Sequence, residues 1–292
     1  MDQDLRPRRS VLYMPGANER ALEKAKGIPA DALIFDLEDA VSPDAKPEAR
    51  DRVCAAAKNG GYGLREVVIR SNGLDTPWGA DDIAAAATSG AAAVLVPKIG
   101  GPDDIAEIVR QLDAAGAPDS MRVWAMLETP AGIFAAREIA AASHRLAVLV
   151  MGTNDIAKEL HAEHVPGRQP MLFALQQCLL AARLAGKVIL DGVYNDIKDE
   201  DGFAAECVQG RQLGFDGKTL IHPSQVEPCN DVFAPSPAEV DQAREIIEAF
   251  TAAKAEGKGV VQVNGRMVEE LHVDNARRAL ALDQAIVALQ QG

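Results

Sequence analysis

The feature that most constrains the fold is a short apolar run that recurs along the chain, with a helical stretch after each run. The runs that we interpret as strands cover residues 10–14, 32–38, 66–70, 93–98, 123–127, 146–151, 188–191 and 217–221. The stretches that we interpret as helices cover about 19–26, 47–58, 79–87, 102–115, 131–142, 170–185, 199–213 and 237–254. Eight strand–helix units in about 250 residues are typical of an α/β protein with a (β/α)8 TIM barrel.

A doubly wound α/β sheet is the alternative architecture. Such a sheet usually has fewer strands and a glycine-rich phosphate turn after the first strand. The sequence contains neither GxGxxG nor GxxxxGK[ST], so the barrel is the better interpretation.

The chain continues beyond the last expected barrel helix. Asn264-Gly265 separates two short runs at 260–263 and 266–268, which predicts a hairpin with a type I′ turn. An amphipathic helix is expected over 272–291. We therefore divide the chain into a barrel at 1–255 and a C-terminal hairpin-plus-helix extension at 256–292, which must pack on the barrel's outside, on its mouth or on another subunit.

Composition excludes several classes of partner. The formal net charge of −13 argues against nucleic acid as the main partner. No apolar run reaches the roughly 18 residues of a membrane span, and the N-terminus resembles no secretory signal. The four cysteines have no metal-ligand spacing, which is typical of reduced thiols in a cytoplasmic protein.

Two carboxylates directly follow neighbouring apolar runs. Glu128 comes after 123–127 and Asp155 comes shortly after 146–151, with a helix expected between them. Parallel strands joined by a right-handed crossover lie side by side, so both carboxylates should face one cavity. Because no histidine or cysteine lies within either motif, we expect a hard divalent cation, Mg²⁺ with Mn²⁺ as an alternative, rather than Zn²⁺.

Other polar residues also follow the expected strands, at the end of the barrel where reactive groups collect. They are Asp36, Glu38, Asp39, Arg70, Asn72, Lys98, Asp191, Asn195 and His222. So many carboxylates would repel one another without a cation, which the metal and Arg70 would supply. Asp36 and Lys98 have an equally good interpretation as members of structural ion pairs, and His222 as a loop hydrogen-bonding residue.

Short motifs at these positions run through the whole chain in order. They are RSVLYMPG (9–16), FDLEDAV (35–41), VIRSN (68–72), VPK (96–98), LETP (127–130), GTND (152–155) and IHP (221–223). Together they resemble the CitE-like branch of the HpcH/HpaI aldolase and citrate lyase β-subunit family, which includes malyl-CoA and citramalyl-CoA lyases.

The resemblance implies a role for each of several residues. Glu128 and Asp155 would hold Mg²⁺, and Glu128 would also contact the substrate. Arg70 would bind the substrate and support a thioester enolate, while Glu38 and Asp39 would hold metal-bound waters. Coenzyme A would lie across the barrel mouth, with Arg20 and Lys24 as candidates for binding its phosphates.

The resemblance also implies a homotrimer or homohexamer in which the extension closes over a neighbouring active site. The family's tail motif places an aspartate two residues after a methionine, followed by any residue and a proline. Here Glu269 takes the place of that aspartate after Met267, and Leu271 replaces the proline. Glutamate keeps the carboxylic acid but adds a methylene, which would affect the rate of the reaction and its type.

We expect a Mg²⁺-dependent lyase that cleaves a 3-hydroxyacyl-CoA of the malyl-CoA or citramalyl-CoA type to an oxo acid and acetyl-CoA. Arg70 would stabilise the developing oxyanion, and Glu269 would protonate the enolate carbon. Asp39 or a metal-bound water would take the 3-hydroxyl proton. A malyl-CoA thioesterase on the same scaffold is the alternative that Glu269 favours. A citrate lyase β-subunit-like protein and a non-catalytic barrel that binds CoA esters are the others.

Overall fold

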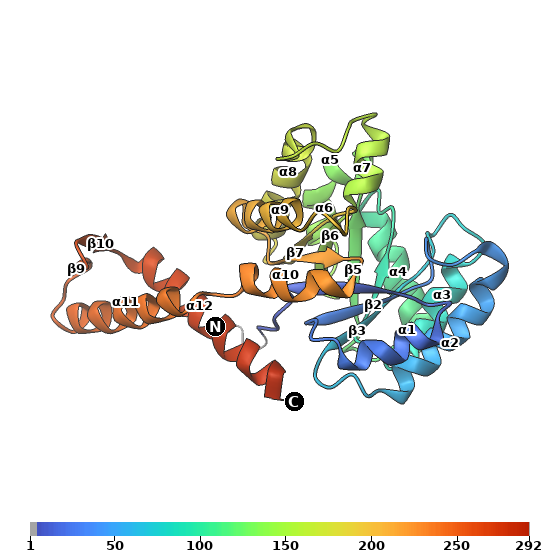
Figure 1. Ribbon diagram of the computed structural model, residues 1–292, viewed down its shortest axis with the longest axis horizontal. Helices are drawn as coiled ribbons and strands as arrows, with labels where there is room; N and C mark the ends of the chain where they lie inside the picture. The colour runs from blue at the N-terminus through green and yellow to red at the C-terminus, as the bar shows by residue number, and fades with distance from the viewer. Residues whose placement is uncertain (1–4, 292) are drawn as a thin grey trace. The chain divides into compact units, whose positions relative to one another are not determined.

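A computed structural model describes residues 5–291, and its central feature is a closed barrel of eight parallel strands in sequence order (Figure 1). The strands are β1 (Ser10–Pro15), β2 (Ala32–Asp36), β3 (Glu66–Arg70), β4 (Ala93–Val96), β5 (Arg122–Leu127), β6 (Leu146–Met151), β7 (Val188–Asp191) and β8 (Gly217–Leu220). Each strand pairs with its sequence neighbour, and β8 pairs with β1. The TIM barrel that the apolar runs predict is confirmed.

Helices follow every strand of the barrel. They are α1 (Glu19–Lys24), α2 (Lys46–Asn59), α3 (Gly79–Ala87), α4 (Pro102–Ala114), α5 (Pro130–Phe134), α6 (Ala136–Ala141), α7 (Thr153–Glu159), α8 (Leu172–Leu184), α9 (Glu200–Leu213) and α10 (Val226–Phe233). The helix expected over 131–142 is two short helices that meet at Ala135. The helix that follows β8 in the barrel is α10, which the sequence analysis missed, rather than the expected helix at 237–254.

The apolar strand residues form two cores because successive side chains of a strand point to opposite faces. Ile34, Leu95, Trp124 and Val150 belong to the cluster that fills the barrel interior. Their strand neighbours point outward and pack beneath the helices in a larger cluster. Strands that are buried on both faces explain why the sequence shows continuous apolar runs rather than alternation.

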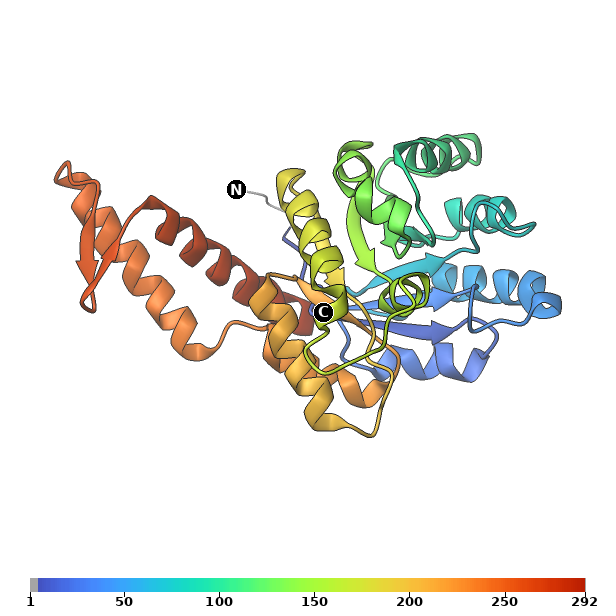
Figure 2. The ribbon, with the colours of Figure 1, turned by 90° about the horizontal axis from the view of Figure 1, so that it is seen from above.

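Residues 234–291 form a second compact unit together with residues 5–7. It contains α11 (Pro237–Ala255), the antiparallel strands β9 (Val261–Val263) and β10 (Arg266–Val268), and α12 (Glu270–Gln291). Figure 2 shows α11 and α12 side by side with the hairpin at one end, and Phe250, Val268 and Val273 form a buried cluster between these elements. The division of the chain therefore falls after Phe233, whereas we placed it after residue 255.

The turn of this hairpin has the predicted chemistry. Asn264 and Gly265 both have positive φ, at 48° and 78°. Type I′ turns require this conformation at both central residues. In the part of the chain that the structure describes, no helix is long and apolar enough to cross a membrane.

The seam between β8 and β1 closes the barrel and depends on a glycine. Lys218 N–H donates to the Arg9 carbonyl at 3.0 Å, and Ser10 lies opposite Lys218. A Cβ atom added at Gly217 would overlap the carbonyl oxygens of Arg8 and Arg9. A glycine is needed where another backbone approaches so closely.

We expect Gly217→Ala to lower the free energy of unfolding by about 1–3 kcal/mol, because the overlap is with backbone that cannot rotate away. The melting temperature should fall by several degrees, measured by circular dichroism. Gly27→Ala is the matched control, since nothing lies within 4 Å of its added Cβ. Equal melting of both variants would contradict this account of the seam.

Candidate functional site

A cavity of about 410 Å³ opens at the carboxyl ends of the barrel strands. Its wall contains Tyr13, Pro15, Asp36, Asp39, Ala40, Arg70, Met126, Glu128, Met151, Gly152, Thr153, Asn154, Asp155, Val193, Thr219 and Ile221. The predicted metal ligands Glu128 and Asp155 thus line the same cavity as Arg70 and Asp39. The wall combines these charged groups with the apolar side chains of Met126, Met151, Val193 and Ile221.

Arg70, the last residue of β3, is fixed by three neighbours. Its Nε and Nη2 donate to the two carboxylate oxygens of Asp36, both at 2.7 Å, and its Nη1 lies 2.8 Å from Glu38 Oε2. Its guanidinium carbon lies 4.8 Å from the centre of the Tyr13 ring, at cation–π distance. Burial by itself lowers the pKa of Arg70, but the Asp36 carboxylate raises it well above the ordinary value, so Arg70 stays charged.

Asp36 also shapes the loop that follows β2. Its Oδ1 accepts from the Glu38 N–H at 2.8 Å, and its Oδ2 accepts from the Ala40 N–H at 3.0 Å. The sequence left open whether Asp36 is a reactive residue or a member of a structural ion pair, and the structure shows an ion pair with Arg70. The same contacts place Glu38 and Asp39, so Asp36 orders this side of the cavity.

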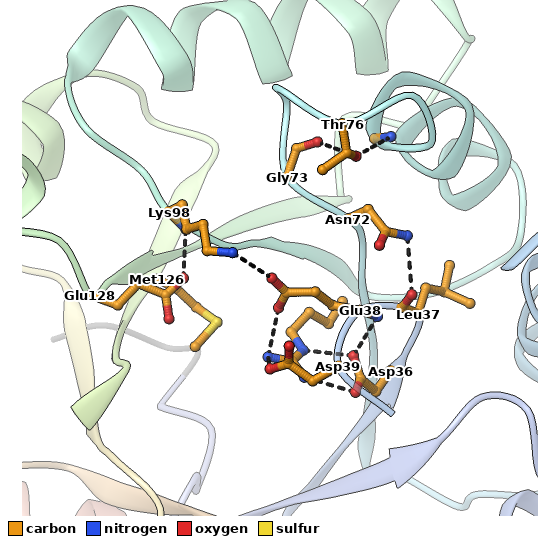
Figure 3. Close-up of polar contacts among 12 residues, drawn as sticks. Asp36, Leu37, Glu38, Asp39, Asn72, Gly73, Thr76, Lys98, Met126 and Glu128 are labelled. Atoms are coloured by element: carbon orange, nitrogen blue, oxygen red, sulfur yellow. Dashed lines mark hydrogen bonds and ion pairs between the residues drawn. The ribbon is translucent and has the colours of Figure 1, made fainter. Parts of the chain in front are cut away.

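Lys98 links two of the carboxylates (Figure 3). Its backbone N–H donates to Glu128 Oε1 at 2.7 Å, and its Nζ lies 3.5 Å from Glu38 Oε1. The residue has a φ of 57°, in the left-handed region that non-glycine residues rarely adopt. Strained backbone of this kind persists where the surrounding structure fixes it, commonly at functional sites.

The surroundings of Glu128 disfavour its ionised form. The residue is only 2% exposed. Burial, with repulsion from Glu38 and Asp155, raises its pKa from an ordinary value near 4.5 to about 8. A Cβ added at Gly152 would overlap the Glu128 carboxylate, so the glycine makes room for that side chain.

The donor set fits Mg²⁺ held mainly by oxygen atoms from outside the protein. Among residues 5–291, no group of three or more histidine, cysteine, aspartate or glutamate side chains is arranged to hold a metal. Mg²⁺ usually keeps several waters and binds through one or two carboxylates plus a substrate oxygen. Glu128 and Asp155 supply such a pair, and a cation there would relieve the repulsion that raises the Glu128 pKa.

Other predicted site residues lie outside this cavity wall. Arg20 and Lys24 are exposed on α1. Glu38 is half-buried behind Arg70 and is held by it. Glu269 is exposed in the second unit, where its N–H donates to His272 Nδ1 at 3.1 Å.

Several polar residues at the strand ends belong to structural networks. Asn72 accepts from Lys46 Nζ at 2.6 Å. Asp191 is fully buried and pairs with Arg168 and Lys218. His222 caps a short 3₁₀ helix, as its loop interpretation predicted.

The sequence analysis missed the uncharged residues of the wall. Tyr13, Met126 and Met151 lie inside apolar strand runs, where nothing distinguishes cavity-facing from core-facing residues. Tyr13 gave the one available signal, a hydroxyl in an otherwise apolar strand. Thr153 begins α7 and Val193 lies in the loop after β7, and the direction of both segments depends on the closed barrel.

Comparison with known proteins gives a consistent result. The sequence model described as HpcH/HpaI aldolase/citrate lyase matches residues 9–223, and one described as a C-C bond lyase of the TIM-barrel fold matches residues 169–285. A Cereibacter sphaeroides protein named (3S)-malyl-CoA thioesterase is 50% identical over 288 residues, covering 99% of each chain. The Escherichia coli citrate lyase subunit beta is 41% identical, covering 94% of this chain and 93% of its own.

A solved structure agrees with these similarities. CitE from Mycobacterium tuberculosis, crystallised with magnesium, acetoacetate and coenzyme A, superposes with a TM-score of 0.75. It is 27% identical and covers 94% of this chain and 97% of its own. The family resemblance predicted from the motifs is confirmed.

We expect Asp36→Asn to lower the free energy of unfolding by about 3 kcal/mol, because it leaves the buried Arg70 without its bidentate partner. Asp39→Asn is the matched control. Its carboxylate lies 3.4 Å from Arg70 and is 76% exposed, so the loss should stay below about 1 kcal/mol. Urea titration followed by tryptophan fluorescence measures both, and equal midpoints would contradict the role assigned to Asp36.

Proposed function

Because the chain belongs to the HpcH/HpaI aldolase/citrate lyase family, we propose that it is a Mg²⁺-dependent enzyme that hydrolyses the thioester of malyl-CoA. The products would be malate and free coenzyme A. The observation that carries this proposal is the 50% identity, over 99% of both chains, to a protein named (3S)-malyl-CoA thioesterase. The cavity that joins Glu128, Asp155 and Arg70 supports it.

The second candidate is the carbon–carbon lyase that the sequence predicted, which would yield an oxo acid and acetyl-CoA. The match of residues 169–285 to the C-C bond lyase model favours it, since this segment includes Glu269. The 41% identity to the citrate lyase subunit beta also supports it. Both reactions place negative charge on a thioester oxygen, so one site could serve either.

Glu128 and Asp155 would hold the cation, which when bound supplies a Lewis acid and a template for substrate oxygens. The M. tuberculosis relative crystallised with magnesium and coenzyme A supports this part of the proposal. Mn²⁺, which also favours carboxylate and water oxygens, could take the same place. The role of this chain is to place both carboxylates in one cavity, where a bound cation would favour the ionised form of Glu128.

Arg70 would stabilise the negative charge that develops on the thioester oxygen. Its rigid pairing with Asp36 and Glu38 means that little reorganisation is needed during the reaction, and one well-placed donor is typically worth about 3 kcal/mol. Glu38 would keep Arg70 and Lys98 in place, and with Asp39 it would orient waters near the cation.

Proton transfer would fall to acids near the reacting carbon. In hydrolysis, Asp39 would take a proton from the water that attacks the thioester carbon and would return it to the sulfur as the carbon–sulfur bond breaks, so that the thiol is released. In the lyase reaction, Asp39 would take the 3-hydroxyl proton and Glu269 would protonate the enolate carbon. Glu269 would then come from an extension that closes over a neighbouring subunit of a homotrimer or homohexamer.

Coenzyme A binding completes the proposal. The exposed cations Arg20 and Lys24 on α1 would contact its phosphates. Acyl-CoA esters and small oxo acids would then be the substrates of this site. The apolar side chains of Met126 and Met151 would contact the carbon chain of the acyl unit.

Glu128→Gln should remove Mg²⁺ binding and lower activity at least 100-fold. It should not lower the melting temperature of the metal-free protein at pH 7. The folded state raises the Glu128 pKa, so ionisation of this group costs stability as pH rises from about 4.5 to about 8, and glutamine removes that cost. Calorimetric Mg²⁺ titration and thermal melting test this, with the exposed Glu163→Gln as control; normal Mg²⁺ binding by Glu128→Gln would refute the site.

Incubation with (3S)-malyl-CoA separates the two reactions. We expect free thiol and malate in equal amounts, without glyoxylate, and complete loss of turnover in EDTA. Glyoxylate and acetyl-CoA in place of malate would select the lyase candidate. Turnover that persists in EDTA would reject the metal-dependent chemistry of both.

A further inference from the structure

Thr153 lines the cavity and carries a buried hydroxyl with no partner. The residue is the first of α7 and is 3% exposed. Within residues 5–291, the buried side-chain atoms without a hydrogen-bond partner are Ser71 Oγ, Gln111 Oε1, Trp124 Nε1, Thr153 Oγ1 and Arg168 Nη2. Thr153 is the member of this group that belongs to the cavity wall. Buried hydroxyls are nearly always bonded, so this one calls for an explanation.

The residues around this hydroxyl leave it without a hydrogen-bond partner. A Cβ added at Gly192 would overlap Thr153 Oγ1, so the side chain packs against bare backbone. Asn154 and Asn195 exchange two side-chain hydrogen bonds, at 3.1 and 2.7 Å, which connect the start of α7 to the loop after β7. These two segments are therefore fixed relative to each other, and neither supplies a hydrogen-bond partner for the Thr153 hydroxyl.

We infer that the Thr153 hydroxyl binds an oxygen atom of the acyl unit in the cavity; this inference rests on the proposed function. A threonine near a helix start populates two side-chain rotamers, so its hydroxyl can turn from Gly192 toward the cavity. The hydroxyl both donates and accepts, whereas Arg70 only donates and the ionised Glu128 only accepts. It can therefore bind a neutral hydroxyl or a carboxylate of the substrate.

The consequence is selection for acyl chains that carry oxygen. A site built to hydrogen-bond a substrate group rejects an analogue without that group, because its own polar atom is then left unpaired. Thr153 would impose this choice in a cavity that also contains the apolar side chains of Met126, Met151 and Val193. Simple hydrocarbon acyl-CoA esters would be poor substrates.

The test compares Thr153→Val, which has the same shape without the hydroxyl, with Thr153→Ser, which keeps the hydroxyl. We expect Thr153→Val to lower kcat/KM for (3S)-malyl-CoA about tenfold, or about 1.4 kcal/mol, and Thr153→Ser to stay within about threefold of wild type. Thr153→Val should melt no lower than wild type, because it removes a buried polar group that has no partner. Loss of activity without loss of stability is the signature of a substrate contact.

Inhibition by two analogues identifies the oxygen that is bound. Succinyl-CoA lacks the 3-hydroxyl, and 3-hydroxybutyryl-CoA lacks the distal carboxylate. The analogue that retains the contacted oxygen should inhibit Thr153→Val about tenfold more weakly than wild type. If neither inhibition constant changes, the contact does not exist.

Three further outcomes would overturn the inference. They are an unchanged kcat/KM in Thr153→Val, a melting temperature several degrees lower in that variant, and an equal loss in Thr153→Ser. If wild type does not turn over malyl-CoA, the proposed function fails separately. Calorimetric binding of (3S)-malate with Mg²⁺ then decides the question, and equal affinity in wild type and Thr153→Val would reject the contact.

Discussion

The arrangement of the site depends on the buried ion pair between Arg70 and Asp36. It joins the carboxyl ends of β2 and β3, which are adjacent in the barrel, and the same aspartate accepts two backbone hydrogen bonds from the loop after β2. Removing both charges from water is costly unless every polar atom is satisfied. Here the pair is bidentate, stacked on Tyr13 and supported by Glu38. Arg70 can therefore present fixed positive charge to a substrate without moving.

The carboxylate of Glu128, elsewhere in the cavity, is less well compensated than Asp36. Glu128 is nearly inaccessible, and its nearest electrostatic neighbours include two further carboxylates, Glu38 and Asp155. The partly exposed Lys98 and the already paired Arg70 compensate only in part. Uncompensated carboxylate charge lowers the stability of the folded protein, but it also increases the affinity of the site for a cation. Stability and function are balanced against each other at this end of the barrel.

The barrel could be predicted from the sequence because strands that are buried on both faces leave continuous apolar runs, and eight such runs alternating with helices in about 250 residues are typical of a TIM barrel. Glu128, Asp155 and Arg70 could be placed together because topology alone brings strand ends to one rim. The helix α10 could not be predicted, since it is short and contains Pro228, which broke the expected pattern. Thr153 and Tyr13 were missed because a cavity wall is defined by three-dimensional closure, not by spacing along the chain. The role of Glu269 could not be predicted from a pattern of burial, because the residue is exposed in the second unit.

Lys98 illustrates how one residue can carry two independent functions. Its main-chain amide holds Glu128 and its ammonium group faces Glu38. The first contact belongs to the peptide backbone and would survive replacement of the side chain, whereas the second would not. The left-handed conformation restricts the replacements mainly to glycine, asparagine and aspartate. Substitutions at position 98 could therefore change the charge near Glu38 and Arg70, while the backbone N–H of this residue would still donate to Glu128.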